Sequence, residues 1–290
     1  MRTRFRRATA SQRDDWPASV YGSFMNIYFL GIAGAGVSAL ASVLHSQGHK
    51  VSGSDEGVFP PVSTYLDSLG IHYAVGFSAA NLPEQIDVAI VGTTAKMVPQ
   101  TNPELAELVR RGVPCHTFAS YLGEHTKARE NLIVAGSFGK SSLTALISFL
   151  LVHGGQDPGW FIGAIPLDLP QTGHNGTDPL FVMEGDEYVV SLKDRRSKFE
   201  LYTPTHVLLS SIVHDHINMF PTMEIYEAPF AQLINRVPDH GLLVACHSYE
   251  PVRRLVGARK AVWYGASPNP GYFADNIAIG EITGFDLLLP

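Results

Sequence analysis

NIYFLGIAGAG, residues 26–36, is a short apolar run that ends in three closely spaced glycines, and the fold class of the chain follows from it. The run predicts a buried strand, and the apolar residues at helical spacing just beyond it predict a helix. Gly31, Gly34 and Gly36 would let the backbone turn tightly and approach a phosphate, whose charge the free N–H groups at a helix start attract. Asp55 ends the next predicted strand, where dinucleotide-binding folds place an acid for ribose hydroxyls. The stretch therefore favours a nucleotide site over the alternative that the glycines only permit close packing of helix on strand.

The rest of the first 129 residues continues this alternation of strand and helix. We expect strands at 50–55, 71–75 and 87–91 and helices at 62–69 and 102–111. Asn102 would cap the last of these helices, and Pro103 would occupy its first position. A regular alternation of this kind predicts a parallel sheet covered on both faces, which forms a first domain over residues 25–129.

A second α/β domain is expected over residues 130–290, after a polar linker at 127–130. Its predicted strands lie at 131–135, 179–183, 206–210, 242–245 and 261–264, and its predicted helices at 140–153 and 224–235. The organisation is therefore two nucleotide-binding α/β domains in tandem.

The composition excludes several classes of protein. Of the 290 residues, 45% are hydrophobic and 17% are charged, which is too apolar for a disordered chain. No apolar run reaches the roughly 20 residues of a membrane span. The net charge of −6 without a basic stripe argues against nucleic acid as a partner, and two cysteines favour a reducing cytoplasm. We expect the Arg-rich residues 1–24 to form a disordered leader or to lie upstream of the functional start at Met25.

A second glycine loop, AGSFGKSS, occupies residues 135–142 between a buried strand and a helix. Lys140 would reach the β- and γ-phosphates of ATP, Ser141 would ligate Mg²⁺, and the loop amides would wrap the phosphate chain. The spacing departs from the usual P-loop pattern because Val134 stands where that pattern has its first glycine. The position of the loop between strand and helix still predicts ATP binding.

Acidic and histidine residues follow two further strands of the second domain. The segment EGDEY, residues 184–188, follows one strand, and HDH, residues 214–216, follows another. Because the carboxyl ends of parallel strands meet at one edge, these groups would gather beside the ATP loop, where oxygen ligands suit Mg²⁺. The alternatives are a solvated acidic turn and a pair of loop histidines with internal partners.

These residues together resemble the Mur ligase family. Residues 31–36, followed by SALA at 38–41 and GSD at 53–55, look like the UDP-binding domain of that family, and NPE at 102–104 matches a further signature of it. Residues 135–142 are similar to the family's ATP loop. FVMEGDEY at 181–188, with RSKF at 196–199, looks closest to the murein peptide branch, which attaches the tripeptide L-alanyl-γ-D-glutamyl-meso-diaminopimelate to UDP-N-acetylmuramate in peptidoglycan recycling.

The resemblance implies a fold, an activity and a set of site residues. The fold would be an N-terminal Rossmann-like UDP-binding domain followed by a P-loop-type, ATP-binding central domain. The activity would be amide-bond formation through an acyl phosphate on the lactyl carboxylate, with ATP and Mg²⁺. The implied ATP ligands are Gly136, Ser137, Gly139, Lys140, Ser141 and Ser142; the UDP-sugar ligands are Gly31, Gly34, Gly36 and Asp55; the metal ligands are Ser141, Glu184 and His216; and the catalytic residues are Lys140, Glu184 and His216.

The chain also departs from the family pattern. Ser137 and Phe138 stand where the family has Thr and a polar residue, and Val213 and Asn218 replace two acids. The family continues beyond residue 290, so the resemblance implies an incomplete central domain and no C-terminal domain. Three alternatives follow: a homologue that binds UDP-sugar and ATP without ligating, a UDP-N-acetylmuramate–L-alanine ligase, and an NAD-dependent oxidoreductase. The last leaves the loop at 135–142 without a role.

Overall fold

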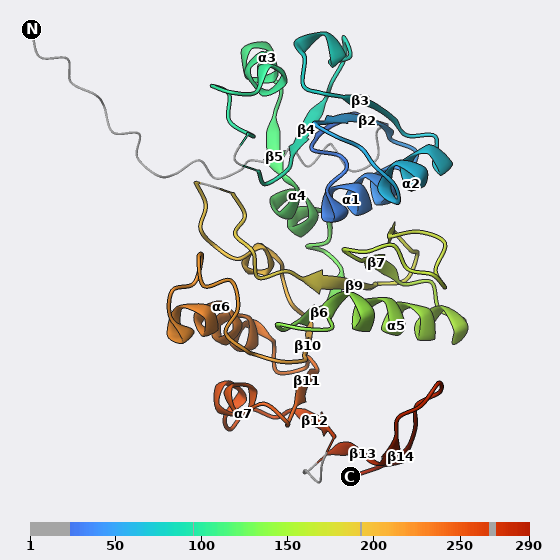
Figure 1. Cartoon of the computed structure of the whole chain (residues 1–290), viewed down its shortest axis with the longest axis vertical. Coiled ribbons are helices and arrows are strands. Elements are labelled where there is room, and N and C mark those ends of the chain that lie inside the picture. Colours follow the sequence, from blue (N-terminus) through green and yellow to red (C-terminus); the bar gives the residue numbers. More distant parts are fainter. Residues whose placement is uncertain (1–23, 95, 192, 267–270) are drawn as a thin grey trace, which may run out of the picture.

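The computed structural model describes residues 24–94, 96–191, 193–266 and 271–290, which form two α/β units stacked along the long axis of the molecule (Figure 1). All of the expected leader except Phe24 lies outside the described residues. Each unit is built on its own sheet. The expected α/β class is confirmed, with a parallel sheet in the first unit and a mostly parallel sheet in the second.

The first unit has a five-stranded parallel sheet in the order β3-β2-β1-β4-β5. Its strands are β1 (Asn26–Leu30), β2 (Lys50–Asp55), β3 (His72–Val75), β4 (Val88–Val91) and β5 (Cys115–Thr117). Its helices are α1 (Ala35–Ser46), α2 (Val62–Ser68), α3 (Pro103–Arg111) and α4 (Phe118–His125), with a 3₁₀ turn η2 at Ala79–Asn81. The strand order reverses at β1, and at such a reversal the loops after adjacent strands leave a crevice for a ligand.

The start of α3 agrees with the sequence prediction in detail. The Asn102 side chain accepts a hydrogen bond from the backbone N–H of Leu105 at 2.9 Å, and Pro103 is the first helical residue. Gly112 ends the helix with φ +71°. By contrast, β5 was not predicted, because its three residues are too few to show a hydrophobic period. The following helix α4 was not predicted either.

The second unit has a nine-stranded sheet in the order β14-β13-β12-β11-β10-β6-β9-β7-β8, in which only the pairs β7–β8 and β13–β14 are antiparallel. Its strands are β6 (Glu130–Ala135), β7 (Gly159–Phe161), β8 (Gly173–His174), β9 (Leu180–Gly185), β10 (His206–Leu209), β11 (Leu243–Cys246), β12 (Val262–Gly265), β13 (Tyr272–Ala278) and β14 (Gly284–Leu288). Its helices are α5 (Lys140–His153), α6 (Met223–Arg236) and α7 (Glu250–Val256), with a 3₁₀ turn η3 at Lys198–Leu201.

Helices cover both faces of the centre of this sheet, as the alternation of side chains along β6 shows. Ile133 belongs to the apolar cluster that includes Phe230 of α6 and Val252 of α7. Its neighbour Val134 belongs to a separate cluster, against which Leu143 and other apolar residues of α5 pack. Successive side chains of a strand point to opposite faces, so α5 lies on one face and α6 and α7 on the other.

The two units share one core and meet along α1. The largest apolar cluster contains Phe29 of β1 as well as Phe181 of β9. The Ser42 hydroxyl of α1 donates to the backbone oxygen of Gly173 in β8 at 3.0 Å, and a Cβ at Gly173 would lie 2.3 Å from the backbone oxygen of Ala39. Gly173 is therefore a close-approach glycine: any side chain there would separate α1 from the second sheet.

In the part of the chain that the structure describes, no helix combines the length and apolar character needed to cross a membrane.

Candidate nucleotide-binding site

The first glycine loop turns directly after β1 and is held by the end of β2. Gly31 has φ +83°, and its N–H and that of Ile32 both donate to the backbone oxygen of Ser54, at 2.8 and 3.0 Å. The Asp55 carboxylate accepts a hydrogen bond from the N–H of Ala33 at 2.9 Å. α1 begins just after Gly34, so the N–H groups of its first turn lack intrahelical acceptors and face the loop. Asp55, predicted as a ribose ligand, thus also orders the glycine loop.

A buried carboxylate supports this loop from behind. Glu104 of α3 has no exposed surface, yet it accepts hydrogen bonds from Tyr28 at 3.2 Å, from the backbone of Ser78 at 3.0 Å and from Asn81 at 2.7 Å. It also accepts one from the Ser54 hydroxyl. A buried carboxylate needs such donors to offset lost hydration. Burial and the Glu104 charge also raise the pKa of Tyr28 far above its usual range. The signature residue Glu104 is therefore a structural anchor of β1, β2 and the η2 turn.

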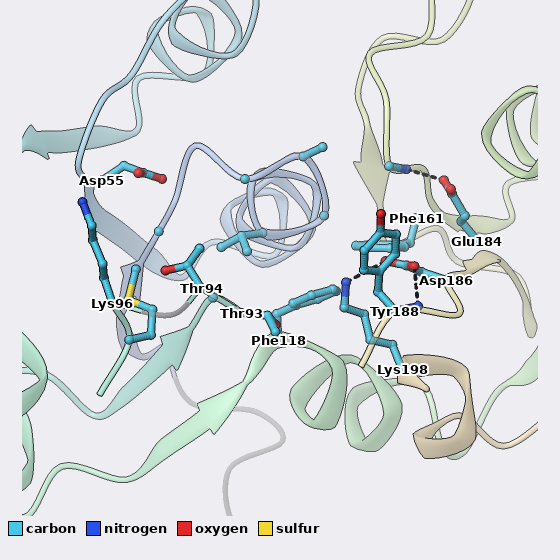
Figure 2. Close-up of a pocket in the computed structure, with 18 of the residues that line it drawn as sticks. Asp55, Thr93, Thr94, Lys96, Phe118, Phe161, Glu184, Asp186, Tyr188 and Lys198 are labelled. Atoms are coloured by element: carbon cyan, nitrogen blue, oxygen red, sulfur yellow. Dashed lines mark hydrogen bonds and ion pairs between the residues drawn. The ribbon is translucent and has the colours of Figure 1, made fainter. Parts of the chain in front are cut away.

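A cleft of about 660 Å³ lies between the two units, in front of the first loop (Figure 2). Asp55 and Lys96 lie on the side of the first unit, and Glu184, Asp186 and Lys198 lie on the side of the second. Phe118 of α4 and Phe161 of β7 stack across the junction, with ring centroids 6.2 Å apart. The predicted residues Gly31, Gly34, Gly36, Asp55 and Glu184 all line this one cleft.

The second glycine loop is held tightly against the end of β10. Gly136 has φ +137°, and a Cβ there would lie 2.2 Å from the Ser210 hydroxyl and 2.8 Å from the backbone nitrogen of Ser211. The Ser137 N–H donates to the Ser211 backbone oxygen at 2.9 Å, and the Ser211 hydroxyl accepts the N–H of Phe138 at 3.0 Å. Gly136 is required because Ser210 and Ser211, which follow β10, pass too close for any side chain. The pair Ser210 and Ser211 was not predicted as loop support.

Ser137, predicted as an ATP ligand, has its hydroxyl turned into the protein. The hydroxyl lies 2.8 Å from the Tyr226 hydroxyl of α6, donates to the Val213 backbone oxygen at 2.9 Å and accepts the Val213 N–H at 2.8 Å. A contact of this residue with a phosphate would therefore use its backbone. Gly139, in the left-handed region at φ +78°, precedes α5, so the first-turn N–H groups of Lys140, Ser141 and Ser142 begin the helix as expected.

Lys140 is bound inside its own loop and to a buried acid. Its ammonium donates to the backbone oxygen of Gly136 at 2.8 Å and lies 2.9 Å from Glu187 Oε2. The other oxygen of Glu187 lies 3.2 Å from His216 Nε2, and the Glu187 side chain is only 1% exposed. Glu187 therefore links the two predicted catalytic residues Lys140 and His216. Glu187 belongs to the acidic segment at 184–188, but nothing in the sequence singles it out from the other acids there.

Glu184 contacts Ser141, the other predicted functional side chain of the second loop. Its Oε1 accepts the Ser141 hydroxyl at 2.9 Å, and its Oε2 accepts the backbone N–H of Gly163 at 2.8 Å. Burial raises the pKa of the Glu184 carboxyl, and these two hydrogen bonds oppose the rise. Ser141 and Glu184 are thus brought together as predicted.

The His216 side chain pairs with Glu187 and not with Glu184 in the described part of the chain. The imidazole also lies beside the adjacent Asp215 and against the ring of Tyr188, whose centroid is 4.2 Å away. The backbone of His216 has φ +52°, in the left-handed region that non-glycine residues seldom adopt. Among the described residues, no group of three or more His, Cys, Asp or Glu side chains is arranged to hold a metal ion by itself.

The fold and the two loops define a tandem α/β protein in which a glycine loop follows the first strand of each unit. Residues 26–130 match the model of the Mur ligase family, catalytic domain, and residues 134–279 match that of the Mur ligase middle domain. The chain belongs to the Mur ligase family.

The relatives carry two different names. A UDP-N-acetylmuramate–L-alanyl-gamma-D-glutamyl-meso-2,6-diaminoheptandioate ligase of Escherichia coli (strain K12) is 32% identical, over 76% of this chain and 48% of its own length. A UDP-N-acetylmuramate–L-alanine ligase of Mycolicibacterium gilvum (strain PYR-GCK) is 35% identical, over 79% of this chain and 47% of its own length. The chain thus spans about half the length of these curated relatives.

A solved structure agrees with the sequence comparison. The UDP-N-acetylmuramate:L-alanyl-gamma-D-glutamyl-meso-diaminopimelate ligase from Neisseria meningitides superposes with a TM-score of 0.80 at 28% identity. The match covers 92% of this chain and 85% of that one. Both units are therefore those of a Mur ligase.

Proposed function

We propose that this chain is the nucleotide-binding part of a cytoplasmic, ATP-dependent ligase that joins a murein tripeptide to the lactyl carboxylate of UDP-N-acetylmuramate. The observation that carries the proposal is that one cleft extends from the first glycine loop to Glu184, which contacts the second loop. The first loop lines the cleft, Glu184 lines the same cleft, and Glu184 also holds Ser141 of the second loop. A sugar nucleotide bound at the first loop would therefore present its far end to a triphosphate at the second.

The reaction that this arrangement serves has two steps. The lactyl carboxylate attacks the γ-phosphorus of ATP, which gives an acyl phosphate and ADP. The amine of the tripeptide then attacks the acyl carbon, and inorganic phosphate and a proton leave as the amide forms. Binding the sugar nucleotide in the cleft and ATP at the adjoining second loop would convert the first step into a reaction between positioned groups, which is a large part of enzymatic rate enhancement.

We assign the residues to these steps as follows. Gly31, Gly34, Gly36 and Asp55 bind the UDP-sugar, and Gly136, Ser137, Gly139, Lys140, Ser141 and Ser142 bind ATP. Lys140 has to exchange Glu187 and the carbonyl of Gly136 for phosphate oxygens, because these groups hold its ammonium in the present structure. The ammonium would then stabilise the charge on the transferring phosphoryl group.

The residues present fit a magnesium ion. Mg²⁺ in such sites is bound by one or two carboxylates together with phosphate oxygens and water. The Ser141 hydroxyl and the Glu184 carboxylate, 2.9 Å apart at the start of α5, supply donors of this kind. When bound, the ion would neutralise charge on the triphosphate. His216 could join such a site through Nδ1, or through Nε2 after that nitrogen leaves Glu187.

A second candidate is a UDP-N-acetylmuramate–L-alanine ligase. The observation in its favour is that relatives with this name match as well as the tripeptide ligases do, at 35% and 32% identity. Both candidates use the same sugar nucleotide and differ in the amine. A homologue that binds both nucleotides without ligating them remains the other alternative.

Isothermal titration with UDP-N-acetylmuramate, Mg-ATP and NAD tests the proposal. We expect the first two to bind and NAD not to bind. The variant Lys140→Ala should weaken ATP binding at least tenfold, because it removes charge-assisted hydrogen bonds, and should leave the affinity for the sugar nucleotide unchanged. Binding of NAD without the UDP-sugar would overturn the proposal, and an equal loss of both nucleotides in the variant would overturn the assignment of two sites.

A further inference from the structure

The segment RSKF, residues 196–199, holds the backbone of Lys198 in a fixed position. Phe199 is fully buried, and its ring centroid lies 5.3 Å from that of Phe230. Arg236 of α6 donates to the backbone oxygens of Phe199 and Glu200 at 3.0 and 2.8 Å. Lys198 is the first residue of the η3 turn that these contacts hold, so its backbone is fixed relative to the second sheet.

The side chain of Lys198 extends from the η3 turn to the junction of the two units (Figure 2). Its ammonium lies 2.6 Å from Asp186 Oδ2, 5.0 Å from the ring centroid of Phe118 and 5.6 Å from that of Tyr188. Only 11% of the side chain is exposed. Aromatic faces attract a cation and confine it, so the ammonium is held in one place before any ligand binds.

Lys198 lines the cleft at the end that adjoins the second loop. In the part of the chain that the structure describes, two lysines and no arginine line this cleft, Lys96 on the first unit and Lys198 on the second. Lys96 is paired with Glu56, and both are more than half exposed. Lys198 shares its end of the cleft with Glu184, which contacts Ser141 of the ATP loop.

The charges at this end explain why a cation is needed there. Glu184 and Asp186 are both carboxylates, and they would repel an anionic group brought next to the ATP loop. A lysine ammonium has three N–H donors, and the described residues supply Lys198 with one hydrogen-bond acceptor, Asp186. Donors remain for a second carboxylate that enters from the cleft.

We propose that Lys198 is a specificity-determining residue that binds the carboxylate of the acyl substrate and thereby selects a sugar nucleotide that carries one. The inference rests on the proposed function, because it takes the ligand of the first loop to be a UDP-sugar. The alternative is a structural role in which Lys198 only fastens Phe118 of the first unit to Asp186 of the second. An apolar side chain of the same length would keep the contact with Phe118 but would offer no donor to the cleft.

The experiment compares two ligands that differ in the carboxylate. UDP-N-acetylmuramate and UDP-N-acetylglucosamine are the same sugar nucleotide with and without the lactyl ether. Their dissociation constants are measured by isothermal titration on the unaltered chain and on Lys198→Met, which keeps the stem against the aromatic rings. We expect the variant to lose at least tenfold in affinity for UDP-N-acetylmuramate and to bind UDP-N-acetylglucosamine as before, since one charge-assisted hydrogen bond accounts for a change of this size.

Two further variants serve as controls for this measurement. Lys96→Met removes the other lysine of the cleft, and we expect it to leave the ratio of the two affinities unchanged. Lys198→Gln repeats the comparison with a polar side chain in case Lys198→Met fails to fold. An equal loss for both ligands, or no loss for either, would overturn the assignment and leave Lys198 a structural role. If the unaltered chain binds neither sugar nucleotide, the proposed function itself fails, and this inference fails with it.

Discussion

The two glycine loops both connect a strand to a helix, but they differ in the protein groups that contact them. In the first loop, the only carboxylate in contact among the described residues is Asp55, which accepts a backbone N–H and leaves the helix start open to the cleft. In the second loop, both functional side chains are already bound, Lys140 to Glu187 and Ser141 to Glu184. The first loop can receive a phosphate by adding contacts, whereas the second must exchange protein carboxylates for phosphate oxygens.

A phosphate-binding loop that contains a buried lysine needs an internal anion, and in the second loop Glu187 supplies it. A buried ammonium without a partner is strongly unfavourable, so the charge has to be compensated before ATP arrives. A loop that binds through backbone N–H groups alone carries only partial charges and needs no such partner. The second loop is therefore more deeply embedded in the protein, and its substitutions should affect stability more than those of the first.

The largest contrast is expected from adding one methyl group to each loop. Gly136→Ala would place a Cβ 2.2 Å from the Ser210 hydroxyl at φ +137°, whereas Gly34→Ala would place one 3.4 Å from its nearest neighbours at φ −63°. We expect Gly136→Ala to lower the free energy of unfolding by about 3 kcal/mol or more, and Gly34→Ala by less than about 1 kcal/mol. Urea denaturation measures both. Equal effects would show that the second loop is no more tightly held than the first.

The next contrast concerns the ion pairs beside the loops. A double-mutant cycle with Lys140→Met and Glu187→Gln should give a coupling of about 1–3 kcal/mol, because the pair is 13% and 1% exposed. The same cycle on Lys96 and Glu56, which are 60% and 63% exposed, should give no coupling beyond experimental error. Both cycles are read from urea denaturation. A coupling as large for the exposed pair would contradict the contrast between the loops.

The smallest effect is expected in the pH dependence of stability. Because burial raises the pKa of Glu184, the folded protein holds this proton more tightly than the unfolded chain does. Its contribution to stability is therefore complete below the ordinary glutamate range and is lost as the pH rises through the raised pKa. Glu184→Gln should remove this loss, so its stability relative to the unaltered chain should improve as the pH rises from the ordinary glutamate range through the raised pKa of Glu184. Parallel profiles for the two proteins would show that Glu184 is not desolvated.

The sequence predicted those parts of the fold that depend on local pattern. β1, β2, α3 and α5 fall within one or two residues of their predicted bounds, since each has a clear apolar period and a glycine, proline or asparagine at its boundary. The short elements β5, β7 and β8 were missed, because two or three residues cannot show a period, and the longer elements α4, α7 and β13 were missed as well. The three short strands form through pairing with longer strands such as β4 and β9.

The site was predictable where chemistry follows chain position, and not where it depends on contacts between distant segments. The glycines and Lys140 are recognised from their place between strand and helix. Glu187 lies 47 residues after Lys140, and His216 lies 29 residues after Glu187. The contacts among these three side chains therefore join segments that are far apart in the sequence. No spacing rule relates such residues, so the pairing of His216 with Glu187 in place of Glu184 came only from the structure.

The contact between α1 and β8 has an entropic consequence. α1 starts at the first glycine loop, and its middle is tied to the second sheet by the hydrogen bond from Ser42 to Gly173. Tyr65 of α2 adds to this attachment, because its hydroxyl accepts the N–H of Thr172 at 3.0 Å. The protein itself therefore holds the two loops at their separation. A ligand that spans the cleft does not have to restrict the motion of two independent domains, so more of its interaction energy is retained as affinity.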